Sequence, residues 1–96
     1  MKICLLASGS KGNALLIESG RTRLLIDAGL SARQIRRRLE LIGIYAASLT
    51  ALLITHEHTD HVRGLGPLVR QLDLPVYLQS DLAGRLPDVG KTAAVR

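Results

Sequence analysis

Aromatic residues are nearly absent from this chain of 96 residues, which contains Tyr45 and Tyr77 but no tryptophan or phenylalanine. The apolar residues are mainly leucine, isoleucine, valine and alanine, so we expect an aliphatic core of the size that one small domain can bury. Single-stranded nucleic acids are usually held by aromatic rings that stack on the bases. The sequence therefore offers no obvious platform for base stacking.

Cysteine and long apolar runs are also scarce. Cys4 is the single cysteine, which excludes an internal disulfide and suits a reducing compartment. We interpret it as a small buried core residue. No apolar run approaches the roughly 20 residues that span a membrane, and the run at the N-terminus is too short for a signal peptide. The sequence therefore predicts no membrane partner.

Positive charge exceeds negative charge, with 13 lysines and arginines against 8 aspartates and glutamates. The net charge of +5 favours anionic substrates. Arg33, Arg36, Arg37 and Arg38 concentrate this charge in one short segment. We interpret the segment as a solvated helix face, and contact with nucleic-acid phosphates is the alternative.

Short apolar runs at 2–7, 14–18 and 23–27 are separated by turn residues, and they predict three strands in a meander. The apolar period then changes over 31–43, where Ser31 is a candidate N-cap and Gly43 a stop, so this segment predicts a helix. Because these runs are apolar at nearly every position, we expect a sheet covered on both faces. The predicted helices can cover only one of them.

The second half of the chain alternates between strands and helices. We predict a strand over 51–54, a helix over 62–72 interrupted near Gly66 and Pro67, a strand over 75–79 and a short helix over 80–86, followed by a loosely specified end. The element order is therefore βββαβαβα. With no internal repeat or linker, residues 1–96 form a single unit of the α/β (α+β) class.

All three histidines of the chain lie in the sequence HEHTDH, residues 56–61. If the chain stays extended after the strand, His56 and His58 project to the same side and can bind one cation. Asp60 and His61 follow where the chain turns toward a helix, and they can serve a neighbouring cation. This H-x-H-x-D-H pattern predicts a metal site with nitrogen and oxygen ligands. Glu57 points away from the first metal, so it is not a predicted ligand.

Two other positions are candidates for supporting roles. Asp27 ends an apolar strand, and we predict that it supports the histidine loop by hydrogen bonds rather than ligating a metal or only forming a turn. The glycine-rich stretch 8–13 offers backbone N–H groups and Lys11 to a phosphate, but a plain tight turn is an equal alternative.

Three stretches, ASGSKGNALLIE, LLIDAGLS and LLITHEHTDHVRGL, occur in this order and spacing. Together they resemble the metallo-β-lactamase superfamily and, within it, the YycJ-like (WalJ) branch related to RNase Z and RNase J. The resemblance implies the N-terminal half of an αββα sandwich with two divalent metal ions, Zn²⁺ or Mn²⁺. It places His56 and His58 on the first metal and Asp60 and His61 on the second, with Asp60 also acting in catalysis.

The resemblance further implies a cytoplasmic phosphodiesterase or exonuclease that acts on DNA or RNA, in which two metals activate water and clamp the scissile phosphate. The family needs further histidines and a bridging aspartate from a second half, yet no histidine follows His61. We therefore expect residues 1–96 to be the N-terminal part of a metallo-β-lactamase domain, inactive alone and prone to self-association. The alternatives are a glyoxalase-II-like thioesterase or lactonase, and a non-catalytic nucleic-acid-binding module.

Overall fold

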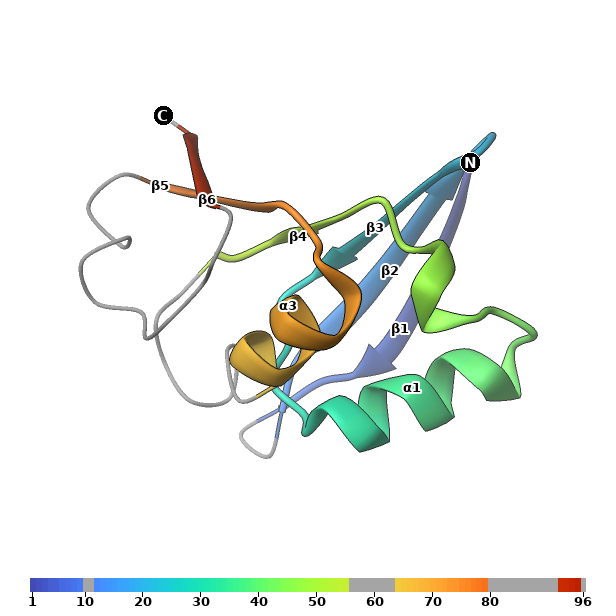
Figure 1. Ribbon diagram of the computed structural model, residues 1–96. Coiled ribbons are helices and arrows are strands. Elements are labelled where there is room, and N and C mark those ends of the chain that lie inside the picture. The colour runs from blue at the N-terminus through green and yellow to red at the C-terminus, as the bar shows by residue number, and fades with distance from the viewer. Residues whose placement is uncertain (10–11, 56–63, 80–91, 96) are drawn as a thin grey trace.

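A six-stranded sheet organises the chain, with its strands arranged in sequence order from β1 to β6 (Figure 1). The computed structural model describes residues 1–9, 12–55, 64–79 and 92–95. Its strands are β1 (Lys2–Ala7), β2 (Ala14–Ser19), β3 (Thr22–Ile26), β4 (Ala51–Leu53), β5 (Val76–Gln79) and β6 (Thr92–Val95). Its helices are α1 (Ala32–Leu41), the short 3₁₀ helix η1 (Ala46–Ser48) and α3 (Leu65–Leu72).

The sheet is mixed. Strands β1, β2 and β3 pair antiparallel, which confirms the predicted meander. Strands β3, β4, β5 and β6 pair parallel, and the connections that contain α1 and α3 provide two of the crossovers that parallel pairing requires. The predicted α/β class is therefore confirmed.

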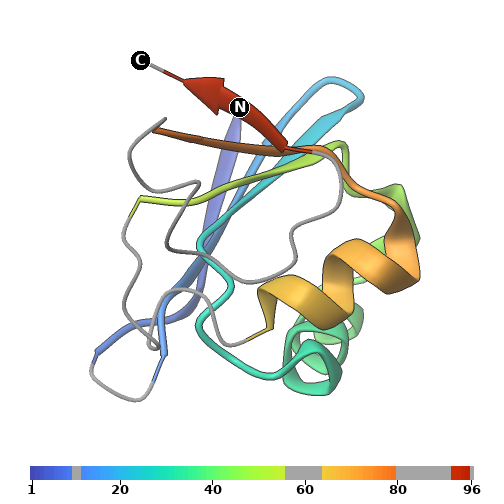
Figure 2. The same ribbon diagram turned by 60° about the vertical axis from the view of Figure 1, so that its left-hand side comes forward.

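One row of side chains across the sheet forms the centre of the core. Cys4, Leu16, Leu25, Leu52 and Val76 are direct neighbours from β1 to β5, and all except the half-buried Cys4 are at most 2% exposed. Helices α1 and α3 lie on this face of the sheet (Figures 1 and 2). Their buried residues complete the aliphatic core that the composition predicts; they include Ile35, Leu39, Leu68 and Val69.

The opposite face of the sheet carries no helix among the described residues (Figure 2). A second apolar row crosses it through Leu5, Leu15, Ile26, Leu53 and Tyr77. Leu5 is 62% exposed and Tyr77 is 39% exposed, while the other three are half-buried. The helices thus cover one face of a sheet that is apolar on both, as the sequence predicts.

Helix α1 has the ends that its sequence predicts. The Ser31 side chain accepts a hydrogen bond from Gln34 N, and the Gln34 side chain accepts one from Ser31 N, which forms a capping box. At the other end Gly43 adopts a positive φ of 77°, and its N–H donates to Glu40 O at 2.9 Å.

Helix α3 corrects the predicted interruption near Gly66 and Pro67. It begins at Leu65 and continues to Leu72, so both residues lie in its first turn. The N–H groups of a first turn have no partner within the helix, so a proline there removes no helical hydrogen bond. Residues 62–63, which the prediction included in this helix, lie outside the described part of the chain.

The end of the chain also differs from the prediction. We interpreted the end of the chain as loosely specified, yet β6 pairs with β5 from Val76↔Thr92 to Gln79↔Val95. Its two alanines have little intrinsic strand preference, although Thr92 and Val95 favour strands, so hydrogen bonds to β5 contribute to its conformation. The helix predicted over 80–86 lies outside the described residues. No helix in the described part of the chain has the length and apolar character needed to cross a membrane.

Candidate metal centre

The predicted ligands His56, His58, Asp60 and His61 all lie in the segment 56–63, which is outside the described residues. The structure does describe the residues on either side of it, Thr55 and Gly64. Both make hydrogen bonds to the chain just after β3. The segment therefore starts and ends at defined places on one framework.

Asp27 holds the start of the segment. Thr55 N donates to Asp27 Oδ1 at 2.8 Å, and Thr55 Oγ1 donates to Asp27 Oδ2 at 2.7 Å. Asp27 is only 6% exposed while Thr55 is exposed, so the two bonds lie at the edge of the core. A hydrogen bond to a carboxylate is charge-assisted and stronger than one between neutral groups. Both carboxylate oxygens are thus directed at the residue that immediately precedes His56.

The next residue, Ala28, holds the end of the segment. Gly64 N donates to Ala28 O at 2.7 Å. A Cβ on Gly64 would lie 2.3 Å from Leu30 O and 3.1 Å from Ile35 Cδ1, so a larger residue would push the chain away from this contact. Consecutive residues of one connection, Asp27 and Ala28, therefore bind both ends of the histidine segment.

The backbone at Asp27 explains how its side chain reaches Thr55. Asp27 N donates to Leu53 O at 2.8 Å, which continues the parallel pairing of β3 with β4. Asp27 then adopts a positive φ of 63°, a conformation that aspartate tolerates better than most residues. The strand ends at this turn, and the carboxylate faces the chain that leaves β4.

The residue types of the histidine segment suit a divalent metal. Three imidazoles and one carboxylate are a donor set that Zn²⁺ and Mn²⁺ accept. Within the described residues, no group of three or more His, Cys, Asp or Glu side chains is placed to hold a metal. The described part of the chain thus offers no rival site.

The glycine-rich turn forms a closed loop beside this framework. Asn13 Nδ2 donates to Gly9 O at 3.0 Å, and Gly9 N donates to Asn13 Oδ1 at 3.3 Å. Gly12 N donates to Gly9 O at 3.2 Å. These N–H groups are used within the turn, which favours the tight-turn interpretation over a phosphate cradle. Lys11 lies outside the described residues.

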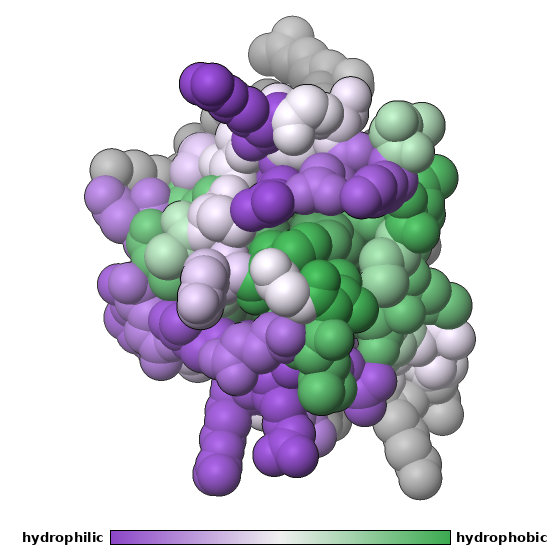
Figure 3. Space-filling model, turned by 90° about the vertical axis from the view of Figure 1, so that its right-hand side faces the viewer, coloured by the Kyte–Doolittle hydropathy of each residue, from purple (hydrophilic) through white to green (hydrophobic). Residues whose placement is uncertain are grey.

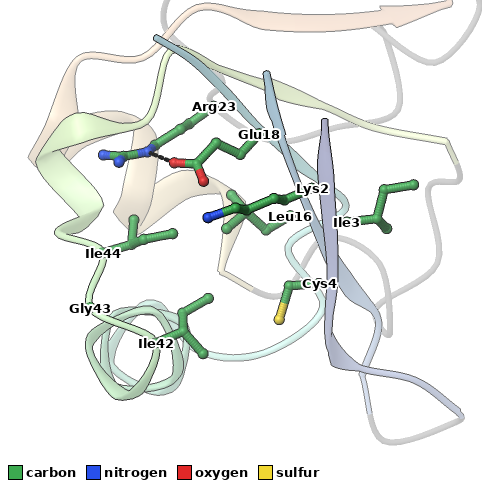
Figure 4. A pocket seen from close by; sticks show the side chains of 9 residues that line it. All are labelled: Lys2, Ile3, Cys4, Leu16, Glu18, Arg23, Ile42, Gly43 and Ile44. Carbon is green, nitrogen blue, oxygen red and sulfur yellow. Dashed lines mark hydrogen bonds and ion pairs between the residues drawn. The ribbon is translucent and has the colours of Figure 1, made fainter. Parts of the chain in front are cut away.

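A separate hollow of about 570 Å³ lies at the other end of the sheet, near the starts of β1 and β3 (Figure 4). Lys2 and the Cys4 thiol point into it, whereas Ile3 points to the other side of β1. Arg23 binds the Glu18 carboxylate and also donates to Ser48 Oγ at 2.7 Å. The hydrogen bond from Arg23 lowers the pKa of Glu18, so this pair is ionised at neutral pH and is lost only in acid.

Apolar side chains form a continuous area at this end of the molecule, bordered by hydrophilic ones (Figure 3). Ile42 and Ile44 contribute to the hollow, and Ile42, the C-cap of α1, is 43% exposed. The hollow belongs to the opposite end of β3 from Asp27, so it forms no part of the metal centre.

The family sequence model of the metallo-beta-lactamase superfamily matches residues 7–94, which is most of the chain. The chain belongs to this superfamily. It is 45% identical over 76 residues to exodeoxyribonuclease WalJ of Streptococcus pneumoniae serotype 2, covering 79% of this chain and 28% of that protein. It is 44% identical over 72 residues to exodeoxyribonuclease YycJ of Bacillus anthracis, covering 75% of this chain and 27% of that protein. The resemblance to the YycJ-like branch is therefore confirmed.

The solved structures agree with this metallo-β-lactamase fold. The chain superposes on the Rm3 metallo-beta-lactamase with a TM-score of 0.85 and 25% identity, covering 98% of this chain and 42% of that one. The predicted fold is thus confirmed. The chain spans just over a quarter of the length of the two exodeoxyribonucleases, 28% and 27%.

Sequence reasoning missed two residues of the framework, Ala28 and Gly64. Ala28 contributes a backbone carbonyl, which no side-chain pattern can reveal. Gly64 had a weak signal, because a glycine between a ligand motif and a helix often marks a close backbone approach. The metallo-β-lactamase motif indicates polar side chains and gives no information about such backbone contacts.

Proposed function

We propose that this chain is the N-terminal part of a metal-dependent phosphodiesterase, an exonuclease that acts on DNA or RNA. The observation that carries the proposal is the H-x-H-x-D-H segment, whose two ends are bound by Asp27 and Ala28. The 45% identity to an exodeoxyribonuclease supports phosphodiester cleavage over the thioesterase and lactonase alternatives. The net charge of +5 suits a polyanionic substrate.

The residues take the following roles in this proposal. His56 and His58 hold the first divalent ion, and Asp60 and His61 hold the second, with Asp60 also at the reacting centre. When bound, Zn²⁺ or Mn²⁺ ions polarise the phosphate and lower the pKa of a water. Asp27 orients the chain entering the site through its two bonds to Thr55. The rest of the ligand set comes from a second half of the protein, which acts in the cytoplasm.

The activity can be tested on the whole protein that carries this chain. We expect it to hydrolyse single- or double-stranded DNA or RNA when supplied with Mn²⁺ or Zn²⁺, and to lose this activity in chelator. A thioester and a lactone are assayed in parallel. Strong thioester hydrolysis without any nucleolysis would refute the proposed substrate class.

The sheet face that carries no helix among the described residues leads to a prediction for the chain of residues 1–96 alone. We expect it to bind metal weakly, to show no catalysis and to self-associate, since a large exposed apolar area usually marks an interface. Light scattering measures the association, and a metal titration measures the affinity.

Two leucines provide a matched pair of variants for the same experiment. Leu5 lies on this sheet face and is 62% exposed, while Leu41 lies at the end of α1 and is 76% exposed. Leu5→Lys should shift the chain to the monomer, and Leu41→Lys should leave its association unchanged. A wild-type monomer that binds two metal ions tightly would show that the site and the core are complete without a second half.

A further inference from the structure

The positive charge of the chain is concentrated in the two helices that cover the sheet. Helix α1 contains four arginines and one glutamate, and α3 contains one arginine and no acid. Their combined charge is therefore +4, against +5 for the whole chain. Asp73, the C-cap of α3, lowers the balance of this layer to +3. The rest of the chain carries the remaining +2, so the helical layer holds most of the net charge.

A groove of about 370 Å³ lies between these helices. It is lined by Arg33, Arg36, Arg37 and Glu40 from α1 and by Gln71 from α3. Arg36 Nε and Nη2 both donate to Gln71 Oε1, at 3.0 and 2.8 Å. The acceptor is a neutral amide, so the bonds fix the guanidinium across the two helices without cancelling its charge. The other N–H donors of Arg36 stay available to a ligand.

Arg33 and Arg37 stand one helical turn apart on the same side of α1. Both are exposed, and neither has a hydrogen bond or ion pair with any residue that the structure describes. A like-charged pair at this spacing destabilises an isolated helix slightly. Glu40 is the one carboxylate among the residues that line the groove. The three arginines therefore hold more positive charge than their surroundings neutralise.

The groove lies between two helices that both begin close to the described ends of the histidine segment. Helix α1 begins five residues after Asp27, and α3 begins directly after Gly64, so the N-terminal ends of both helices lie at the edge that holds the histidine segment. The close approach of Gly64 to Leu30 O confirms that the two helix starts adjoin there. Arg33 occupies the first turn of α1 and is thus on the metal side of the groove.

We propose that the α1–α3 groove binds the phosphate backbone of duplex DNA and directs the strand to the metal centre. Arginine suits phosphate because its planar guanidinium donates two parallel hydrogen bonds. Since the chain has two tyrosines and no other aromatic residue, the groove reads the backbone of a duplex and not stacked single-strand bases. The choice of DNA rests on the proposed function, but the phosphate binding depends only on the arginines.

The test measures how the whole protein's affinity for a short DNA duplex of arbitrary sequence depends on salt concentration. Binding is followed by fluorescence anisotropy, with a chelator present so that the duplex is not cleaved. Each neutralised phosphate contributes about 0.9 to the slope of log K against log salt. Arg33→Gln with Arg37→Gln should therefore reduce the slope by about 1.8 and weaken binding roughly tenfold or more at 0.1 M salt. Arg33→Lys with Arg37→Lys should keep most of the slope.

The control removes the same charge from the other end of the molecule, through Lys2→Gln with Arg21→Gln, and it should change the slope far less. An equal decrease of the slope in the two double variants would contradict the proposed groove, because binding would then depend only on net charge. Tighter binding of an RNA duplex, or of poly-glutamate, than of the DNA duplex would also overturn the proposal.

The proposed function and the groove are tested separately by a small phosphodiester. Hydrolysis of bis(p-nitrophenyl) phosphate by the whole protein reports on the metal centre, because this substrate has no duplex backbone for the groove to bind. The control variant Lys2→Gln with Arg21→Gln should leave this hydrolysis unchanged. Arginine-dependent duplex binding without any phosphodiester hydrolysis would refute the proposed function and support the groove. Phosphodiester hydrolysis together with duplex binding that does not depend on the arginines would support the proposed function and refute the groove.

Discussion

Replacing Asp60 or His61 by alanine is expected to remove the second metal ion and most of the turnover of the whole protein. A two-metal centre depends on both ions, because one of them cannot stabilise the attacking and the leaving oxygens together. Glu57→Ala serves as the control, since an extended chain is expected to direct Glu57 away from the metal that the proposal assigns to His56 and His58. Metal content is measured by atomic emission, and turnover is measured on a nucleic acid.

The pattern across the variants decides the ligand assignment. His56→Ala and His58→Ala should each weaken the first metal, while Glu57→Ala should retain the full metal content. A full complement of metal in the His61 variant would contradict the assignment. Loss of metal in the Glu57 variant would show that the chain does not stay extended after β4.

Asp27→Ala is expected to lower the affinity for metal by about 10- to 100-fold, the usual range for a residue that orients a metal ligand. The substitution removes both acceptors of the Thr55 hydrogen bonds, so the chain enters the histidine segment without a fixed direction. It also leaves the Thr55 N–H without its partner, which costs about 1–3 kcal/mol of stability. Isothermal titration and chemical unfolding measure the two effects.

Asp73 provides the matched control for Asp27. It is the other non-glycine residue with a positive φ among the described residues, at 53°, and it caps the C-terminal end of α3, the end opposite Gly64. Asp73→Ala therefore removes the same charge from the same backbone conformation. Metal affinity should stay unchanged in this variant. An equal loss of affinity in both variants would mean that Asp27 acts only through general stability.

Most of the fold could be predicted because apolar patterning and turn residues agree in the first half of the chain. Ser31 and Gly43 marked both ends of α1, and the three apolar runs before them became the meander. Prediction failed where local signals conflict with tertiary contacts. Gly66 and Pro67 look like a break but lie in a first turn, and β6 depends on hydrogen bonds to β5.

The candidate site could be predicted only in its polar residues. The H-x-H-x-D-H pattern indicates ligands because their spacing follows from strand geometry. Asp27 was predicted to support the histidine loop by hydrogen bonds, and that role stays a prediction. The structure shows its carboxylate bound to Thr55, the residue before the loop. Ala28 acts through its carbonyl, so its role depends on which chain segments adjoin, and a single sequence does not carry that information.

The two apolar faces of the sheet also bear on how its strands find their alignment. In most sheets a slip of one residue exposes the apolar set, and this penalty fixes the register. In β2 both faces are apolar through Leu15 and Leu16, so a slip would exchange one apolar surface for another. Glu18 lies directly opposite Arg23, which in turn binds Ser48, and a slipped strand would break this set of bonds. This ion pair is half-buried and keeps contact with solvent, and such pairs add little to stability. Its main contribution here is therefore to distinguish the native alignment from its neighbours.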